Sequence, residues 1–195
     1  MQHEIAFVIE VAKSTGALLR DRFGKTNIIH KKEDDSLVSE ADIEAHNYIL
    51  QALSREFPDH DILSEEQPNA LHTDISQRPT WVIDPLDGTS NFLARIPLFT
   101  VAIALVVDCQ TQIGVIYDPI HNELFSAQRG QGATLNGERI FVSKRDVPRG
   151  AMLFAGRLQD VRGPRFTALL GGVILSAGFL VAGEIDHADT LYLCH

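Results

Sequence analysis

The most informative segment of the chain reads Trp81-Val82-Ile83-Asp84-Pro85-Leu86-Asp87-Gly88-Thr89-Ser90-Asn91-Phe92. It opens with aromatic and β-branched residues, a composition typical of a buried strand. Pro85 has a fixed φ and no backbone N–H, so we expect the strand to break there and the chain to turn. Such a turn would point the carboxylates of Asp84 and Asp87 and the carbonyl oxygen of Leu86 into one small volume.

Oxygen atoms gathered in this way predict a site for a hard divalent cation, because Mg²⁺ prefers carboxylate, carbonyl and water oxygens. Gly88, Thr89 and Ser90 follow directly. If a helix begins there, its free N–H groups would form an anion site beside the cation. The alternative is that Asp-Gly after Asp-Pro forms only a turn between two strands, since such dipeptides are common in loops.

The whole segment resembles the signature of the inositol monophosphatase family, whose pattern reads roughly W-x-[IV]-D-P-[IL]-D-G-T-x-N-F. All fixed positions of that pattern are present. The resemblance covers residues 1–150 closely and residues 165–195 loosely. It implies Mg²⁺-dependent hydrolysis of a phosphate monoester such as inositol monophosphate. It also implies an α+β fold, a layered α-β-α-β-α sandwich of the sugar-phosphatase type.

The resemblance assigns metal ligands within this chain. Glu65, Asp84 and the carbonyl of Leu86 would hold one ion that activates the attacking water. Asp84 and Asp87 would contribute to a second ion, which stabilises the leaving oxygen. The implied cofactor is therefore Mg²⁺, as two or three ions.

Further residues would act on the water and the phosphate. Thr89, oriented by Asp42, would accept a hydrogen bond from the nucleophilic water or help to deprotonate it, and together with Glu65 these residues make up the implied catalytic group. The N–H groups after the second aspartate would cradle the phosphate oxygens. The implied substrate-binding residues are Leu86, Asp87, Gly88, Thr89 and Ser90.

Two amphipathic helices are predicted before the signature. Residues 3–23 place apolar side chains on one face, and a second helix opens within residues 37–42 and ends at Pro58. Ser39 and Asp42 resemble a capping box, which would give Asp42 a structural role at the helix N-terminus. The family's L-V-T-x-x-D element instead sets this aspartate against the threonine of D-G-T. Both interpretations stay open.

Residues 61–66 are expected to form a short strand that leads into two glutamates. Adjacent glutamates in a loop are normally only solvated. The family has a matching S-E-E element, which implies that Glu65 ligates metal and that Glu66 acts nearby, on the water or an additional ion. Residues 25–38 are polar and predict a loop or an irregular hairpin, where the resemblance implies a phosphate-facing charge at Lys32.

Strands are expected to dominate the chain after the signature. Residues 98–107 are apolar on both alternating faces, and residues 112–117 and 123–127 continue an antiparallel meander. Asn136-Gly137 between two apolar runs is a strong signal for a two-residue hairpin turn.

The chain is expected to divide into two parts. Residues 1–150 would form an α+β domain that carries the metal site, and residues 151–195 a partial C-terminal α/β subdomain in which residues 169–182 resemble a buried helix. The family's next landmark is a Trp-Asp pair that supplies a further metal ligand. The chain stops at Cys194-His195, about where that tryptophan should come. The C-terminal part is therefore expected to be incomplete, as in a fragment, and a degenerate site is the alternative.

Composition and charge limit the class of protein. The net charge of −9 argues against a nucleic-acid-binding surface. The longest apolar run, Leu98 to Val107, is too short to span a bilayer, and the N-terminus lacks the basic region of a secretory signal. Cys109 and Cys194 have no metal-type spacing and are expected to be reduced, which favours a cytoplasmic protein without a membrane partner. The eight histidines lack ligand spacing and are expected to be surface or lightly packed residues.

Other functions fit parts of the sequence. The resemblance implies a homodimer, lithium sensitivity and a small phosphorylated polyol or sugar as substrate. A 3′(2′),5′-bisphosphate nucleotidase or a fructose-1,6-bisphosphatase-like activity is the alternative among enzymes, although nucleotidase signatures often continue with Lys-Glu-Phe where this chain has Ser90-Asn91-Phe92. A catalytically weak interaction protein on the same scaffold is the alternative from another class.

Overall fold

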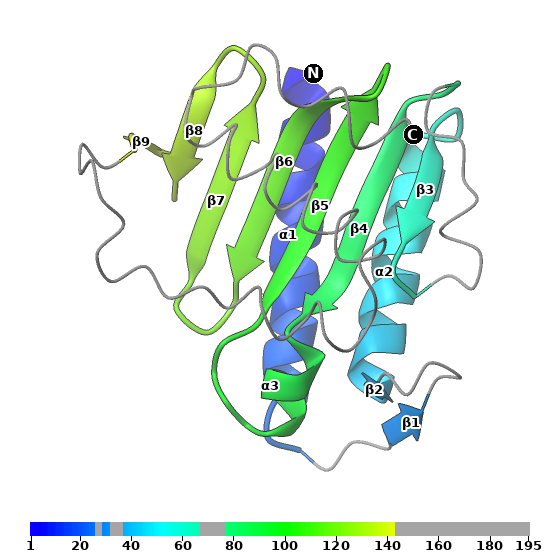
Figure 1. The fold of residues 1–195 in the computed structure, drawn as a ribbon, viewed down its shortest axis with the longest axis vertical. Helices are drawn as coiled ribbons and strands as arrows, with labels where there is room; N and C mark the ends of the chain where they lie inside the picture. The colour runs from blue at the N-terminus through cyan, green and yellow to red at the C-terminus, as the bar shows by residue number, and fades with distance from the viewer. Residues whose placement is uncertain (26–28, 32–36, 67–76, 143–195) are drawn as a thin grey trace.

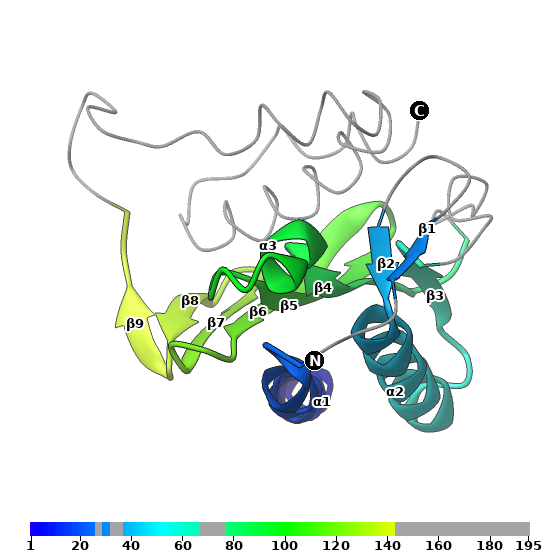
Figure 2. The same ribbon diagram turned by 90° about the horizontal axis from the view of Figure 1, so that it is seen from below.

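The computed structural model describes residues 1–25, 29–31, 37–66 and 77–142. In these residues a seven-stranded sheet carries two long helices, α1 (Gln2–Arg22) and α2 (Glu40–Glu56), on one face. The view from below in Figure 2 shows the two helices side by side under the sheet. This arrangement confirms the α+β class that the sequence predicts.

The strands of the sheet follow one another in chain order, from β3 to β9 (Figure 1). The first pair, β3 and β4, is parallel and every later pair is antiparallel. Their bounds are β3 Asp61–Ser64, β4 Thr80–Asp87, β5 Thr100–Val107, β6 Gln110–Asp118, β7 Glu123–Gln128, β8 Gly132–Leu135 and β9 Glu138–Ile140. A separate antiparallel pair, β1 (Ile29–Lys31) and β2 (Leu37–Ser39), agrees with the irregular hairpin predicted there.

Helix α1 packs through one face and approaches the sheet closely. Its buried residues recur at helical spacing: Val8, Val11, Ala12, Thr15, Gly16 and Leu19. A Cβ atom added to Gly16 would lie 2.5 Å from Cε1 of Tyr117 and 3.0 Å from Cβ of Pro119. A side chain at this position would therefore hold the helix away from β6.

Three aromatic rings fix the short helix α3 (Thr89–Leu93) to the rest of the molecule. The ring of Phe92 lies 5.6 Å from that of Phe23, just after α1, and 4.9 Å from that of Phe99, just before β5. Phe92 and Phe99 are each 2% exposed. Burial of this much aromatic surface anchors the segment that follows the acidic signature.

The expectation that the strand ends at Pro85 is wrong. Strand β4 continues to Asp87, and its pairing with β5 shifts between Asp84, opposite Ala102, and Asp87, opposite Thr100. Three residues of β4 thus span two of β5, which is a β-bulge. A bulge is where proline fits within a paired strand, because one position there makes no ladder hydrogen bond.

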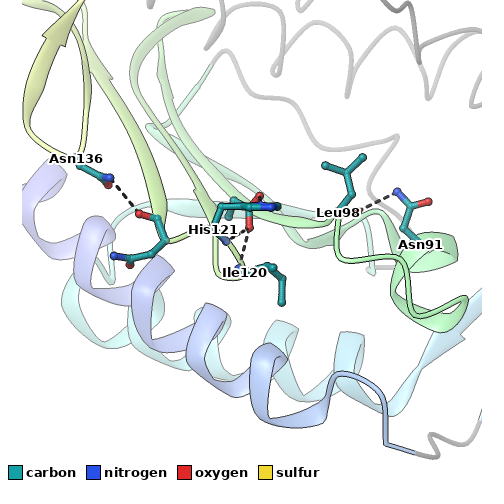
Figure 3. A network of polar contacts seen from close by, with 7 residues as sticks. Asn91, Leu98, Ile120, His121 and Asn136 are labelled. Carbon is teal, nitrogen blue, oxygen red and sulfur yellow. Dashed lines mark hydrogen bonds and ion pairs between the residues drawn. The ribbon is translucent and has the colours of Figure 1, made fainter.

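The hairpin predicted at Asn136-Gly137 is confirmed. Both residues have positive φ, 51° and 84°, and join β8 to β9, as a type I′ turn requires. The side chain of Asn136 also accepts a hydrogen bond from Leu124 N–H at 2.9 Å. It donates one to the carbonyl of Asn122 at 3.1 Å (Figure 3). The turn is therefore tied to the start of β7 as well.

The prediction of a reduced thiol is wrong at Cys109, because this residue, between β5 and β6, is disulfide-bonded. The predicted subdomain 151–195, with its helix over 169–182, lies outside the described residues. Among the helices that are described, none combines the length and apolar character needed to cross a membrane.

Candidate active site

Parallel pairing of β3 and β4 brings the two acidic segments to the same edge of the sheet. Ser64 lies opposite Ile83, and the N–H of Glu65 donates to the carbonyl of Ile83 at 3.3 Å. Glu65 thus leaves β3 beside the point where β4 reaches Asp84. Because the carboxyl ends of parallel strands lie at a common edge, Glu65 and Asp84, which are 19 positions apart in the chain, start from adjacent main-chain positions.

The bulge in β4 buries an acid that is held by the following main chain. Asp84 is 4% exposed, and its Oδ1 accepts a hydrogen bond from the N–H of Leu86 at 3.2 Å. Burial raises the pKa of Asp84 well above its usual range, and the charges of Asp87, Glu66 and Asp42 raise it further, while the Leu86 N–H opposes them. Negative charge is therefore concentrated around a buried carboxylate.

The second acid of the signature has a similar environment. Burial raises the pKa of Asp87 above its usual value, and a hydrogen bond with the side chain of Thr100 acts in the opposite direction. Thr100 is the residue opposite Asp87 across the bulge. A cation bound between these two neighbouring carboxyl groups would stabilise their ionised forms, which their raised pKa values show to be disfavoured without it.

Asp42 takes both of the roles that the sequence leaves open. Its Oδ2 accepts hydrogen bonds from the N–H and the hydroxyl of Ser39, at 2.8 and 2.5 Å, and completes the capping box of α2. Its Oδ1 accepts the hydroxyl of Thr89 at 2.8 Å. Asp42 is 2% exposed, so burial holds this carboxylate between the start of α2 and the residue that follows the signature glycine.

The hydroxyl of Thr89 is oriented by two acceptors. Besides Asp42, it lies 3.1 Å from the carbonyl oxygen of Leu86. A hydroxyl has one donor hydrogen and two lone pairs. Since its hydrogen points at these acceptors, Thr89 Oγ1 presents its lone pairs as acceptors to a donor such as water.

The turn between β4 and α3 requires glycine. Gly88 has a φ of 100°, and a Cβ atom there would lie 3.1 Å from the carbonyl oxygen of Leu98. The same carbonyl accepts the side-chain amide of Asn91 at 2.9 Å (Figure 3). Helix α3 spans only Thr89–Leu93, and the first N–H groups of any helix have no acceptor within it.

Sequence reasoning missed one pair of residues beside the site. His46 Nδ1 lies 2.8 Å from Ser64 Oγ, which also accepts the N–H of Glu66 at 3.3 Å. The available signal was the spacing from Asp42 to His46, since residues four apart lie on the same face of a helix. His46 is itself half-buried, which the expectation of surface or lightly packed histidines allows, but it bonds the hydroxyl of Ser64, a residue that is 1% exposed.

The structure brings together part of the predicted site. Asp42, Thr89, Leu86 and Asp84 are joined by hydrogen bonds. Glu65 adjoins them through its main chain, although no group of three or more His, Cys, Asp or Glu side chains is arranged to hold a metal ion within the described part of the chain. The donor chemistry of the bulge still fits a hard cation: it offers the buried carboxyl group of Asp84, the half-buried carboxyl group of Asp87 and a carbonyl oxygen. Lys32 and any ligand after residue 142 lie outside the described residues.

Known proteins resemble the chain over most of its length. A family model described as the inositol monophosphatase family matches residues 1–172. A protein of Mesembryanthemum crystallinum named inositol monophosphatase is 40% identical over 144 residues, which cover 73% of this chain and 53% of that protein. A protein of Salmonella typhimurium named Nus factor SuhB is 32% identical over 203 residues, which cover 95% of this chain and 75% of that protein.

Solved structures give the same result for the fold. An inositol monophosphatase of Thermotoga maritima superposes with a TM-score of 0.67 at 28% identity, covering 88% of this chain and 73% of that one. A structure described as an IMPase/NADP phosphatase complexed with Mg²⁺ and phosphate superposes with a TM-score of 0.62 at 27% identity, covering 71% of this chain and 52% of that one. The chain thus spans between about half and three quarters of the lengths of these proteins.

Proposed function

This chain belongs to the inositol monophosphatase family, and from that premise we propose that it hydrolyses a phosphate monoester with the help of Mg²⁺. The proposed substrate is a small phosphorylated polyol or sugar, with inositol monophosphate as the first candidate. The observation that carries the proposal is the bulge at Asp84 and Asp87, where two carboxyl groups with raised pKa values lie beside the Thr89–Asp42 hydrogen bond.

Asp84, Asp87 and the carbonyl of Leu86 would hold the metal, with Glu65 reaching in from the end of β3. When bound, two or three Mg²⁺ ions would neutralise the dianionic ester and lower the pKa of a water molecule. The negative charges that surround Asp84 support this assignment, because they disfavour its ionised form until a cation compensates them. One solved relative is described as complexed with Mg²⁺ and phosphate, which also supports it.

Thr89 and the turn before it would handle the water and the phosphate. The hydrogen of the Thr89 hydroxyl is directed at Asp42, so its oxygen would accept a hydrogen bond from the attacking water. This hydrogen bond would orient a lone pair of the water oxygen towards phosphorus. The N–H groups of Gly88, Thr89 and Ser90 would bind the phosphate oxygens, because the first N–H groups of α3 have no acceptor within the helix. N–H groups fixed in this way do not need to reorient when negative charge develops on the phosphate oxygens in the transition state.

The sharpest test removes one carboxylate charge without changing its shape. We expect Asp84→Asn to weaken Mg²⁺ binding by at least about tenfold and to reduce phosphate release from inositol 1-phosphate in parallel. Asp61→Asn is the matched control, because Asp61 begins β3 and pairs with Arg78 at 3.0 Å, away from the bulge. Calorimetry and a phosphate assay measure the two effects. Equal Mg²⁺ binding by Asp84→Asn and the unmodified chain would contradict the proposed site.

A related phosphatase activity is the alternative within the same chemistry. Ser90-Asn91-Phe92 occupies the place where nucleotidase signatures often carry Lys-Glu-Phe, which favours inositol monophosphate over a 3′(2′),5′-bisphosphate nucleotide. A panel of inositol 1-phosphate, 3′-phosphoadenosine 5′-phosphate and fructose 1,6-bisphosphate separates these activities. We expect the highest kcat/KM for inositol 1-phosphate.

An interaction protein with weak catalysis is the candidate from another class. It is favoured by the relative named Nus factor SuhB, which the chain matches over most of its length. In that case the unmodified chain would bind Mg²⁺ weakly, or not at all, and would release no phosphate from any of the three substrates.

Two further properties are proposed from the family: a homodimer and inhibition by lithium. A cytoplasmic location and the absence of nucleic-acid and membrane partners stay proposals from the sequence, and the location draws no support from the cysteines, because Cys109 is disulfide-bonded. Sedimentation of the purified chain tests the dimer, and turnover in millimolar lithium tests the inhibition. A monomer, or turnover that lithium leaves unchanged, would contradict the corresponding property.

A further inference from the structure

A histidine on α2 contacts the strand end that delivers the two glutamates. His46 Nδ1 lies 2.8 Å from Ser64 Oγ, and Ser64 is the last residue of β3. The same oxygen accepts the N–H of Glu66 at 3.3 Å. One buried hydroxyl therefore connects the helix to the main chain of the Glu65-Glu66 pair.

Ser64 is well placed to couple the position of His46 to the main chain at the end of β3. It is 1% exposed, and its partner across the parallel pair is Ile83, the residue before Asp84. A buried hydroxyl that loses a hydrogen-bond partner destabilises the folded state, because water does not reach it to replace the partner. The chain at residues 64–66 thus has a strong preference for the conformation in which both bonds form.

The same helix face also holds the other half of the site. Asp42 and His46 are four residues apart in α2 and project from adjacent turns of one face. Asp42 bonds Thr89 after β4, and His46 bonds Ser64 at the end of β3. The first turns of α2 therefore fix both strand ends relative to one another.

We propose that His46 is a positioning residue, which acts through Ser64 to fix the main chain at the end of β3 so that Glu65 and Glu66 face the bulge at Asp84. The inference rests on the proposed function, because it assigns the glutamates a task in cation binding. Electrostatics support the placement, since the charge of Glu66 acts on Asp84.

Four variants test the connection. His46→Ala and Ser64→Ala each remove one partner. His46→Asn keeps a polar atom the same number of bonds from Cα as Nδ1, whereas His46→Gln moves it one bond further. Asn47→Ala is the control, because Asn47 is exposed on the next position of α2.

Two measurements are needed, and the first does not depend on metal. Hydrogen exchange in EDTA reports on the Glu66 N–H, and calorimetry measures the dissociation constant for Mg²⁺. We expect faster exchange at Glu66 and about tenfold weaker Mg²⁺ binding in His46→Ala and Ser64→Ala. We also expect little further loss in the double variant, since both changes break one connection. His46→Asn should retain the properties of the unmodified chain better than His46→Gln.

The outcomes separate the inference from the proposed function. Unchanged exchange at Glu66 in both alanine variants would overturn the inference, whatever the metal binding. Faster exchange with unchanged Mg²⁺ affinity would overturn the positioning of the glutamates for a cation while leaving the proposed function standing. An unmodified chain that binds no Mg²⁺ would overturn the proposed function, and the inference would fall with it.

Discussion

At the scale of single residues, Asp42 shows how one carboxylate can join a helix cap to a candidate site. One of its oxygens closes the capping box with Ser39, and the other accepts the hydroxyl of Thr89. The two roles need different oxygens, so they do not compete. Burial of the group makes both hydrogen bonds difficult to replace by water.

Thr89 is the residue whose substitution tests this arrangement most directly. Thr89→Val keeps the shape and removes the hydroxyl, so we expect kcat for phosphate release to fall by about a hundredfold with a much smaller change in KM. Thr89→Ser keeps the hydroxyl and should retain most of the activity. Steady-state kinetics at saturating Mg²⁺ measure both, and a Thr89→Val variant with an unchanged kcat would show that the hydroxyl takes no part.

At the scale of elements, the β-bulge in β4 lies at the two aspartates of the signature, Asp84 and Asp87. The strand is buried along nearly its whole length, and the bulge at Pro85 shifts its register against β5 without ending it. A regular strand would send Asp84 and Asp87 to opposite faces of the sheet, because they are an odd number of residues apart. The extra residue changes that alternation, so the two carboxyl groups can share one region.

The docking of α1 on β6 gives a prediction about stability at this scale. We expect Gly16→Ala to destabilise the fold by about 1–3 kcal/mol, because the new methyl group would overlap the ring of Tyr117, which is 6% exposed. Ser14→Ala, at an exposed position of the same helix, is the control and should be neutral or slightly stabilising. Urea denaturation measures both variants, and equal or greater stability of Gly16→Ala would contradict the close approach.

At the scale of the whole molecule, two histidines are expected to affect stability in opposite directions as pH changes. The ring of His60 stacks on that of Phe57, with centroids 5.2 Å apart, and lies tilted against Trp81 at 6.0 Å. Burial, and to a lesser degree Arg78, lowers the pKa of His60 below 6.5, although Glu4, Asp59 and Asp61 oppose the shift. For His121, the hydrogen bond with Asp118 at 2.8 Å raises the pKa above 6.5 (Figure 3).

The signs follow from proton linkage. The folded state binds the His60 proton more weakly than the unfolded state, so His60 lowers stability as pH falls below 6.5 towards its folded pKa. The stabilisation from His121 is fully present below 6.5 and is lost as pH rises through its folded pKa. We expect His60→Gln to reduce the acid loss of thermal stability, and His121→Gln to reduce the loss on the alkaline side. Melting curves against pH, followed by the fluorescence of the single tryptophan Trp81, measure both. Parallel curves for the two variants would contradict this account.

The sequence by itself determined the elements and the candidate acids. Helical spacing of apolar residues predicted α1, the Ser39 cap marked the start of α2, and Asn136-Gly137 predicted its hairpin, because each of these signals is local in the chain. The signature and its family resemblance singled out Glu65, Asp84 and Asp87 for the same reason. These inferences needed only the residues within one or two turns of each other.

Only the tertiary structure decided how these pieces meet. A bulge accommodates Pro85 because β5 still pairs with β4 after it, at Asp87 opposite Thr100. The sequence of β4 alone does not reveal that pairing. The bond between His46 and Ser64 spans 18 residues and joins a helix to a strand. The helical spacing of Asp42 and His46 places both on one face of α2, but it does not identify Ser64 as the partner. Long-range hydrogen bonds form when packing brings buried polar groups together, because each such group requires a partner once it has lost water.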